Sequence, residues 1–75
     1  MTLDERFLIK LYEMAAAGGD PKRPMNYQAI AKMLSVKETA LKTIIRHLAQ
    51  ANFIKKIDET TLQLTERGCR LAADM

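Results

Sequence analysis

Hydrophobic positions along this chain follow a helical period in four segments and a strand period in one region between them. Apolar residues recur three and four positions apart within residues 2–17, 27–34, 36–51 and 66–75. Between residues 53 and 65 the spacing changes to alternation. The pattern predicts a mainly helical chain with one small β-hairpin. The expected order is helix, short extended segment, two helices, hairpin and closing helix.

The first two helices have recognisable ends. Thr2 and Glu5 form a capping box, and Gly18-Gly19 predicts the end of that helix near residue 17. Two prolines within residues 20–24 favour a loop, and a short extended segment at residues 25–27 follows it. Asn26 is a candidate cap for the second helix. The positions expected to point inward are Leu3, Phe7, Leu8, Leu11, Met14 and Ala15 in the first helix, and Ile30, Ala31 and Leu34 in the second.

The segment from residue 36 to residue 51 is the most informative. Ser35 and Glu38 have the spacing of a capping box, and Asn52 suits the left-handed residue that ends a helix. A 3.6-residue period divides the helix into two faces. The inward face holds Leu41, Ile44, Ile45, Leu48 and Ala51, and the outer face holds Thr39, Lys42, Thr43, Arg46 and Gln50. The outer face therefore combines cations and hydrogen-bonding groups without a large apolar residue.

The last third of the chain predicts a hairpin and a short helix. Residues 53–57 and 61–65 read as strands joined by a turn at 58–60, with Leu62 and Leu64 pointing inward. Thr65 is the expected cap of the final helix, whose Gly68, Leu71, Ala72 and Met75 share one face. Glycine inside a helix costs about 1 kcal/mol, so Gly68 indicates a close approach of two backbones.

Charge is segregated along the chain, although the net value is only +3. Residues 22–56 carry eight cations and one acid, a net +7, whereas residues 1–20 and 57–75 each carry −2. This distribution favours a polyanionic partner for the middle of the chain.

Composition argues against several other classes. Cys69 and His47 are the only cysteine and histidine, which is too few ligands for a structural zinc site, and no disulfide can form within the chain. Neither residue belongs to a recognisable acid–base pair, so we expect no enzyme, no metal and no cofactor. A single cysteine fits a reducing compartment, and we expect a cytoplasmic protein. No apolar run reaches membrane-spanning length, so no membrane partner is expected.

Three stretches resemble the winged helix-turn-helix superfamily, in particular small bacterial and archaeal regulators of the MarR and related types. They are AIAKMLSVKETALKTIIRHL at 29–48, ANFIK at 51–55 and LTERGCRL at 64–71. The resemblance covers nearly the whole chain and implies one winged-helix domain over residues 1–75. Its parts would be the helix-turn-helix at 27–51, the wing hairpin at 53–65 and the closing helix at 66–75.

The resemblance implies sequence-specific binding of duplex DNA by a small transcriptional regulator, with helix 36–51 in the major groove. Base reading would fall to Thr39, Lys42, Thr43 and Arg46. Phosphate contacts would fall to Lys22, Arg23, Lys32, Lys37, Lys55 and Lys56. We also predict a weak homodimer through the first helix, with Ile9 and Tyr12 in the contact.

The wing departs from the usual pattern, because its tip carries Asp58 and Glu59 in place of basic residues. Phosphate would repel both side chains, which disfavours insertion of the wing into the minor groove. The alternative prediction is therefore a winged-helix module or adaptor subunit that binds a protein partner and not DNA. RNA binding is a third candidate.

Overall fold

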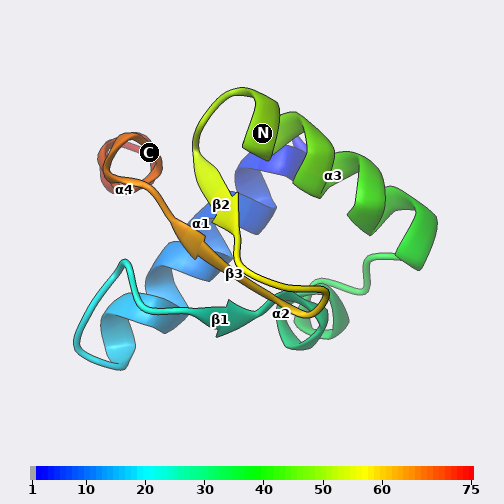
Figure 1. The fold of residues 1–75 in the computed structure, drawn as a ribbon, viewed down its shortest axis with the longest axis horizontal. Coiled ribbons are helices and arrows are strands. Elements are labelled where there is room, and N and C mark those ends of the chain that lie inside the picture. The colour runs from blue at the N-terminus through cyan, green and yellow to red at the C-terminus, as the bar shows by residue number, and fades with distance from the viewer. Residues whose placement is uncertain (1) are drawn as a thin grey trace.

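The computed structural model describes residues 2–75 and shows four helices with a small antiparallel sheet (Figure 1). The helices are α1 (Leu3–Ala17), α2 (Tyr27–Met33), α3 (Glu38–Gln50) and α4 (Glu66–Ala73). The strands are β1 (Met25–Asn26), β2 (Ile54–Lys56) and β3 (Thr61–Leu64). The predicted order of elements and the mainly helical class are confirmed.

Three of the predicted caps are present. Thr2 and Glu5 make the reciprocal capping box of α1, with both hydrogen bonds formed. The Asn26 Oδ1 atom accepts from the backbone N–H of Gln28 at 2.9 Å, and the Thr65 hydroxyl accepts from the N–H of Gly68 at 3.0 Å. Each side chain satisfies a donor that the first turn of a helix leaves without a partner.

The predicted capping box at Ser35 and Glu38 is wrong. Helix α3 begins at Glu38 after Lys37, which makes no side-chain cap hydrogen bond. Ser35 instead has a left-handed backbone, with φ of 55°, and ends α2. The N–H of Val36 binds the carbonyl of Ala31 at 2.9 Å, and that of Ser35 binds Lys32 at 3.2 Å, which is a Schellman arrangement. Because Ser35 terminates the preceding helix, it cannot also cap the next one.

The same arrangement ends α3 at Asn52, as predicted. Asn52 has φ of 62°, and the N–H of Phe53 binds the carbonyl of Leu48 at 2.9 Å. The helix therefore covers 38–50, two residues shorter at its start and one at its end than the predicted 36–51. The chain then turns directly into β2.

The sheet has the strand order β1-β3-β2, with both pairings antiparallel. Ile54 pairs with Leu64 and Lys56 pairs with Leu62 in the β2–β3 hairpin. The alternation predicted for the second strand is confirmed, because Leu62 and Leu64 are both buried. Strand β1 pairs with β3 through only two residues, and it attaches the start of α2 to the hairpin.

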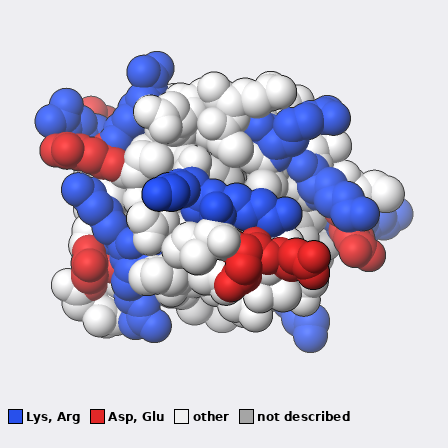
Figure 2. Space-filling model, in the orientation of Figure 1, with Lys and Arg blue, Asp and Glu red and all other residues white. Residues whose placement is uncertain are grey.

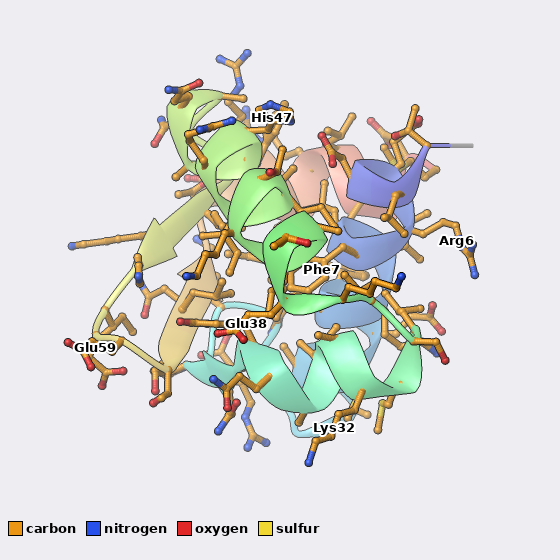
Figure 3. All side chains as sticks on the ribbon, turned by 90° about the vertical axis from the view of Figure 1, so that its right-hand side faces the viewer. Arg6, Phe7, Lys32, Glu38, His47 and Glu59 are labelled. Atoms are coloured by element: carbon orange, nitrogen blue, oxygen red, sulfur yellow. The ribbon has the colours of Figure 1, made fainter. Side chains whose placement is uncertain are left out.

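The core lies where α1, α2, α3 and the inner face of the hairpin meet. Its fully buried large side chains are Phe7, Leu8, Leu11, Ile30, Leu62 and Leu64. Figure 3 shows Phe7 directed from α1 into the space behind α3. Two predicted inward residues are exposed, Leu3 by 39% and Met75 by 45%. Leu3 is the first residue of α1. Met75 lies two residues beyond α4, which ends at Ala73 and not at residue 75 as predicted.

Gly68 is buried on α4 and faces the start of the hairpin. A Cβ atom on Gly68 would lie 2.0 Å from the backbone oxygen of Phe53. That oxygen also accepts the N–H of Thr65 at 3.1 Å, and the Thr65 hydroxyl donates to the carbonyl of Asn52 at 2.6 Å. The predicted close approach of two backbones is therefore confirmed.

Candidate nucleic-acid interface

The outer face of α3 is a polar, cationic surface. Thr39, Lys42, Thr43 and Arg46 are all exposed, whereas Leu41, Ile44, Ile45 and Leu48 on the opposite side are buried. At 1.5 Å per residue, the 13 residues of α3 span about 20 Å. The Thr43 hydroxyl donates to the Thr39 carbonyl at 3.2 Å, so its oxygen lone pairs stay available as acceptors.

The two lysines of β2 point to different sides of the hairpin. Successive strand residues alternate faces, so Lys56 shares the side of buried Ile54, whereas Lys55 faces outward. Lys56 turns toward α3, and its ammonium nitrogen lies 5.9 Å from the centre of the Tyr27 ring. A cation at this distance from an aromatic face is held electrostatically. The alternation of the strand was the sequence signal that could have distinguished these lysines.

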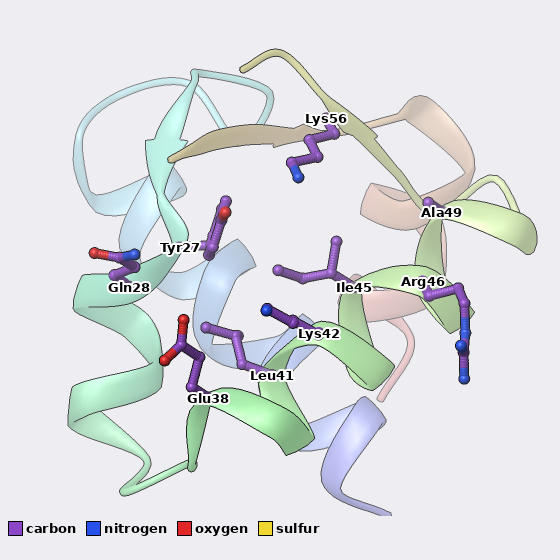
Figure 4. A pocket seen from close by; sticks show the side chains of 9 residues that line it. All are labelled: Tyr27, Gln28, Glu38, Leu41, Lys42, Ile45, Arg46, Ala49 and Lys56. Carbon is purple, nitrogen blue, oxygen red and sulfur yellow. The ribbon is translucent and has the colours of Figure 1, made fainter. Parts of the chain in front are cut away.

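A groove of about 390 Å³ separates α3 from β2 and the start of α2. Leu41, Ile45 and Ala49 contribute apolar surface to it from α3. Figure 4 shows the Lys42 and Lys56 ammonium groups directed into the groove, while the Arg46 guanidinium points away from it. Glu38 places its carboxylate at the end beside Tyr27 (Figure 4). The groove thus brings Lys56 of β2 together with Lys42 of α3.

The loop between β2 and β3 is fixed by its own polar side chains and by α2. The Asp58 Oδ1 atom accepts from the backbone N–H groups of Thr60 and Thr61, at 2.9 and 2.8 Å. The hydrogen bond from the Thr60 backbone is the main cause that holds the pKa of the Asp58 carboxyl below its ordinary value. The Tyr27 hydroxyl donates to the Glu59 carbonyl, and the Tyr27 N–H binds the Thr60 carbonyl at 3.1 Å. Asp58 therefore shapes the loop, and Glu59 is the acid with no such role.

The six predicted phosphate-contacting residues do not form one surface. Lys55 and Lys56 lie on β2, and Lys32 and Lys37 lie on α2 and just before α3. Lys22 and Arg23 lie in the loop between α1 and β1, at the far end of the molecule from α3 (Figure 1). Lys22 is close enough to Cys69 on α4 to affect its titration, and Arg23 reaches back to Gly18. The structure thus separates Lys22 and Arg23 from the other four.

Figure 2 shows Lys and Arg side chains over α3 and β2, and others at the left over α4 and the loop between α1 and β1. Acidic side chains lie over the loop after β2, near the start of α3 and at the left of the view. The first turn of α3 supplies Glu38, and the loop supplies Asp58 and Glu59. The acids of the loop after β2 therefore lie directly beside the cations over β2 and interrupt the positive surface (Figure 2).

The predicted dimer residues lie on α1, away from the outer face of α3. Ile9 is partly exposed at the edge of a shallow groove between α1 and the end of α2. Tyr12 is also partly exposed, but it packs against the hydrophobic core. Ile9 is therefore the more accessible of the two for contact with another molecule.

The remaining titratable groups include one contact between α3 and α1 and one partly buried thiol. Within residues 2–75, no group of three His, Cys, Asp or Glu side chains gathers as metal ligands do. His47 on α3 pairs with Asp4 on α1, with Nδ1 and Oδ2 3.2 Å apart, and this contact joins two helix ends. Burial raises the pKa of the partly buried Cys69 thiol. In the described part of the chain, no helix is long and apolar enough to cross a membrane.

Comparison with known proteins adds no assignment. No protein-family model, curated protein or solved structure matches the chain.

Proposed function

We propose that this chain is a winged helix-turn-helix domain that binds duplex DNA sequence-specifically, with α3 in the major groove, as a small transcriptional regulator. In this proposal α2 and α3 form the helix-turn-helix, the β2–β3 hairpin is the wing, and α4 closes the domain. A cytoplasmic location, with access to DNA, is part of the proposal.

The observation that carries the proposal is the outer face of α3. A major groove about 12 Å wide accepts one α-helix whose outward side chains can reach base edges. Helix α3 presents four exposed polar or cationic residues, Thr39, Lys42, Thr43 and Arg46, and keeps its large apolar residues in the core. Four further lysines belong to α2, the turn and the wing, and Lys56 is the one that turns toward α3: Lys32, Lys37, Lys55 and Lys56.

The side chains divide into reading and positioning roles. Arg46 extends away from the groove beside the wing (Figure 4), and a guanidinium can pair with the two acceptors of guanine. Thr39 and Thr43 suit contact with a thymine methyl group or a base acceptor. Lys42 and Lys56 approach each other across the groove, a suitable place for a backbone phosphate. Lys22 and Arg23 have no part in this interface.

A protein-binding module is the second candidate. Ile57, in the wing, is 47% exposed, which suits contact with a protein. The wing loop is acidic, whereas binding of DNA phosphates would favour basic residues there. Such a module would use the wing as its contact and leave α3 solvated.

The test measures binding of the purified protein to random-sequence duplex DNA by fluorescence anisotropy across a salt series. Four phosphate contacts give a slope of log affinity against log salt near −3.6, from about −0.9 per contact. Lys55→Ala should flatten the slope by about one contact. Lys22→Ala is the matched control, since it removes the same charge from the far side and should leave the slope unchanged. Absence of binding at low salt would reject the DNA proposal and favour the protein module.

Sequence reading is tested by Arg46→Ala on a selected site. Loss of a bidentate base contact should cost roughly 1–3 kcal/mol of binding and relax preference at one base pair. Thermal unfolding should hardly change, because Arg46 is exposed. Leu48→Ala is the opposite control: it should lower the free energy of unfolding by roughly 2–5 kcal/mol. Unaltered affinity in folded Arg46→Ala and Lys42→Ala variants would show that α3 does not contact DNA.

A further inference from the structure

Strand β2 forms an open edge of the sheet. The strand order β1-β3-β2 places it outermost, so its hydrogen-bonding partner strand lies on one side only. The N–H of Ile57 binds the carbonyl of Thr61 on the β3 side at 2.9 Å. Because residues of an antiparallel strand bond alternately to its two sides, the N–H and C=O groups of Ile54 and Lys56 point away from β3. A strand edge of this kind can pair with another chain.

The surroundings of this edge are cationic and partly apolar. The groove of about 390 Å³ between β2 and α3 is lined by three cations, Lys42, Arg46 and Lys56, and by one acid, Glu38. Lys42 and Lys56 direct their ammonium groups into the groove (Figure 4). Ile57, directly after β2, is 47% exposed. The edge thus offers backbone donors and acceptors, positive charge and one uncovered apolar side chain.

We propose that an acidic, extended segment of a partner protein pairs with β2 and becomes a fourth strand of the sheet beside α3. An added strand lies about 4.8 Å from its neighbour, and its side chains alternate between the two faces. The side chain opposite Lys56 therefore lies on the groove side, and the one opposite Lys55 lies on the outer side. Opposite charges at directly opposed strand positions attract, so both positions suit carboxylates. The main-chain hydrogen bonds supply affinity, and the alternate side chains supply specificity.

Charge and backbone pattern together select this occupant. Two copies of β2 paired edge to edge would bring Lys55 and Lys56 of both copies together, and like charges across a strand pair are destabilising. A nucleic acid could neutralise the lysines, but its backbone has no alternating N–H and C=O groups to match the edge. It would also leave Ile57 uncovered. An acidic peptide strand matches the charge, the backbone groups and the apolar side chain.

The added strand would occupy Lys42 and Lys56, which the proposed function places at a DNA phosphate. Peptide and DNA would then exclude each other, and this consequence rests on the proposed function. Strand pairing itself does not depend on DNA binding, so its test contains no DNA.

The test measures, by fluorescence anisotropy, binding of the peptide Ser-Val-Glu-Asp-Val-Thr-Ser, labelled at its N-terminus and amidated at its C-terminus. In antiparallel pairing its Glu lies opposite Lys56, its Asp opposite Lys55 and its second Val opposite Ile54. We expect a Kd between about 10 µM and 1 mM at low salt. Lys56→Glu should weaken binding about tenfold, and a peptide with Lys in place of its Glu should recover it. Lys22→Glu makes the same charge change on the far side of the molecule and should alter the Kd by less than about twofold.

Methylation of single peptide nitrogens separates strand pairing from charge attraction. In the expected register the N–H of the peptide Glu donates to the carbonyl of Lys56, whereas the N–H of the peptide Asp points away from β2. Methylation at the Glu nitrogen should weaken binding about tenfold, and methylation at the Asp nitrogen should change it by less than about threefold. The two methylated peptides carry identical charges, so they are matched controls for each other.

Equal losses from the two methylations would overturn the proposal, as would absence of binding at about 1 mM protein. Hydrogen exchange at the amides of Ile54 and Lys56 reports the occupied edge directly, and saturating peptide should slow both. Slowing that grows with protein concentration without peptide would instead identify a second copy as the occupant and also overturn the proposal.

Discussion

Replacing Gly68 with alanine should destabilise the protein strongly, although alanine is the better helix former. In an open helix this substitution would gain about 1 kcal/mol. Here the new Cβ would lie 2.0 Å from the Phe53 backbone oxygen and 3.1 Å from Leu64 Cδ2. The oxygen belongs to the chain between α3 and β2, so relief requires α4 to move away from the hairpin.

The magnitude follows from what that movement breaks. Overpacking in a closely packed contact costs about 1–3 kcal/mol, and loss of the Thr65 N–H bond to Phe53 adds roughly 1 kcal/mol. After subtraction of the helix-propensity gain of about 1 kcal/mol, we expect a net loss of about 1–3 kcal/mol. For a domain of this size that corresponds to a fall in Tm of roughly 5–20 °C. Urea and thermal unfolding followed by circular dichroism at 222 nm measure both quantities.

Gly18→Ala is a matched control for this substitution. Its Cβ would also be too close to a neighbour, 1.7 Å from Arg23 Nη1, but that atom ends a flexible exposed side chain that can rotate away. Its φ of −83° is open to alanine. We expect Gly18→Ala to change the free energy of unfolding by less than about 0.5 kcal/mol. Equal losses at the two glycines, or no loss at Gly68, would refute the reasoning.

Other expectations concern the wing loop and the cysteine. Glu59→Gln should leave unfolding unchanged and tighten DNA binding modestly at low salt, whereas Asp58→Ala should lower stability, because it removes the acceptor of the loop N–H groups. Since folding lowers the pKa of Asp58 below its ordinary 3.8, its stabilising contribution is present above that pH and is lost as pH falls through the lowered pKa. Acid unfolding of Asp58→Asn should therefore be less steep with pH than that of the wild type. The raised pKa of Cys69 predicts slower alkylation in the native protein than in urea at pH 8, and equal rates would contradict its burial.

The sequence by itself determined most of the local structure. Thr2, Asn26 and Thr65 cap their helices through hydrogen bonds to residues two or three positions away, so a short window contains both partners. Asn52 ends α3 for a similarly local reason. Gly68 is different, because its partner Phe53 is distant, but a glycine inside a helix was already a sign of close contact.

Tertiary structure decided the features in which two elements compete or meet. Ser35 has the spacing of a capping box for α3, but its left-handed backbone ends α2. The turn between the two helices is too short for Ser35 to end α2 and also cap α3. Charge counting grouped Lys22 with Lys56, but the fold places Lys22 near α4 and Lys56 beside α3. Position along a chain fixes which face of its own helix or strand a residue occupies. Packing among segments distant in sequence decides which other elements that face contacts. This packing is known only from the folded chain.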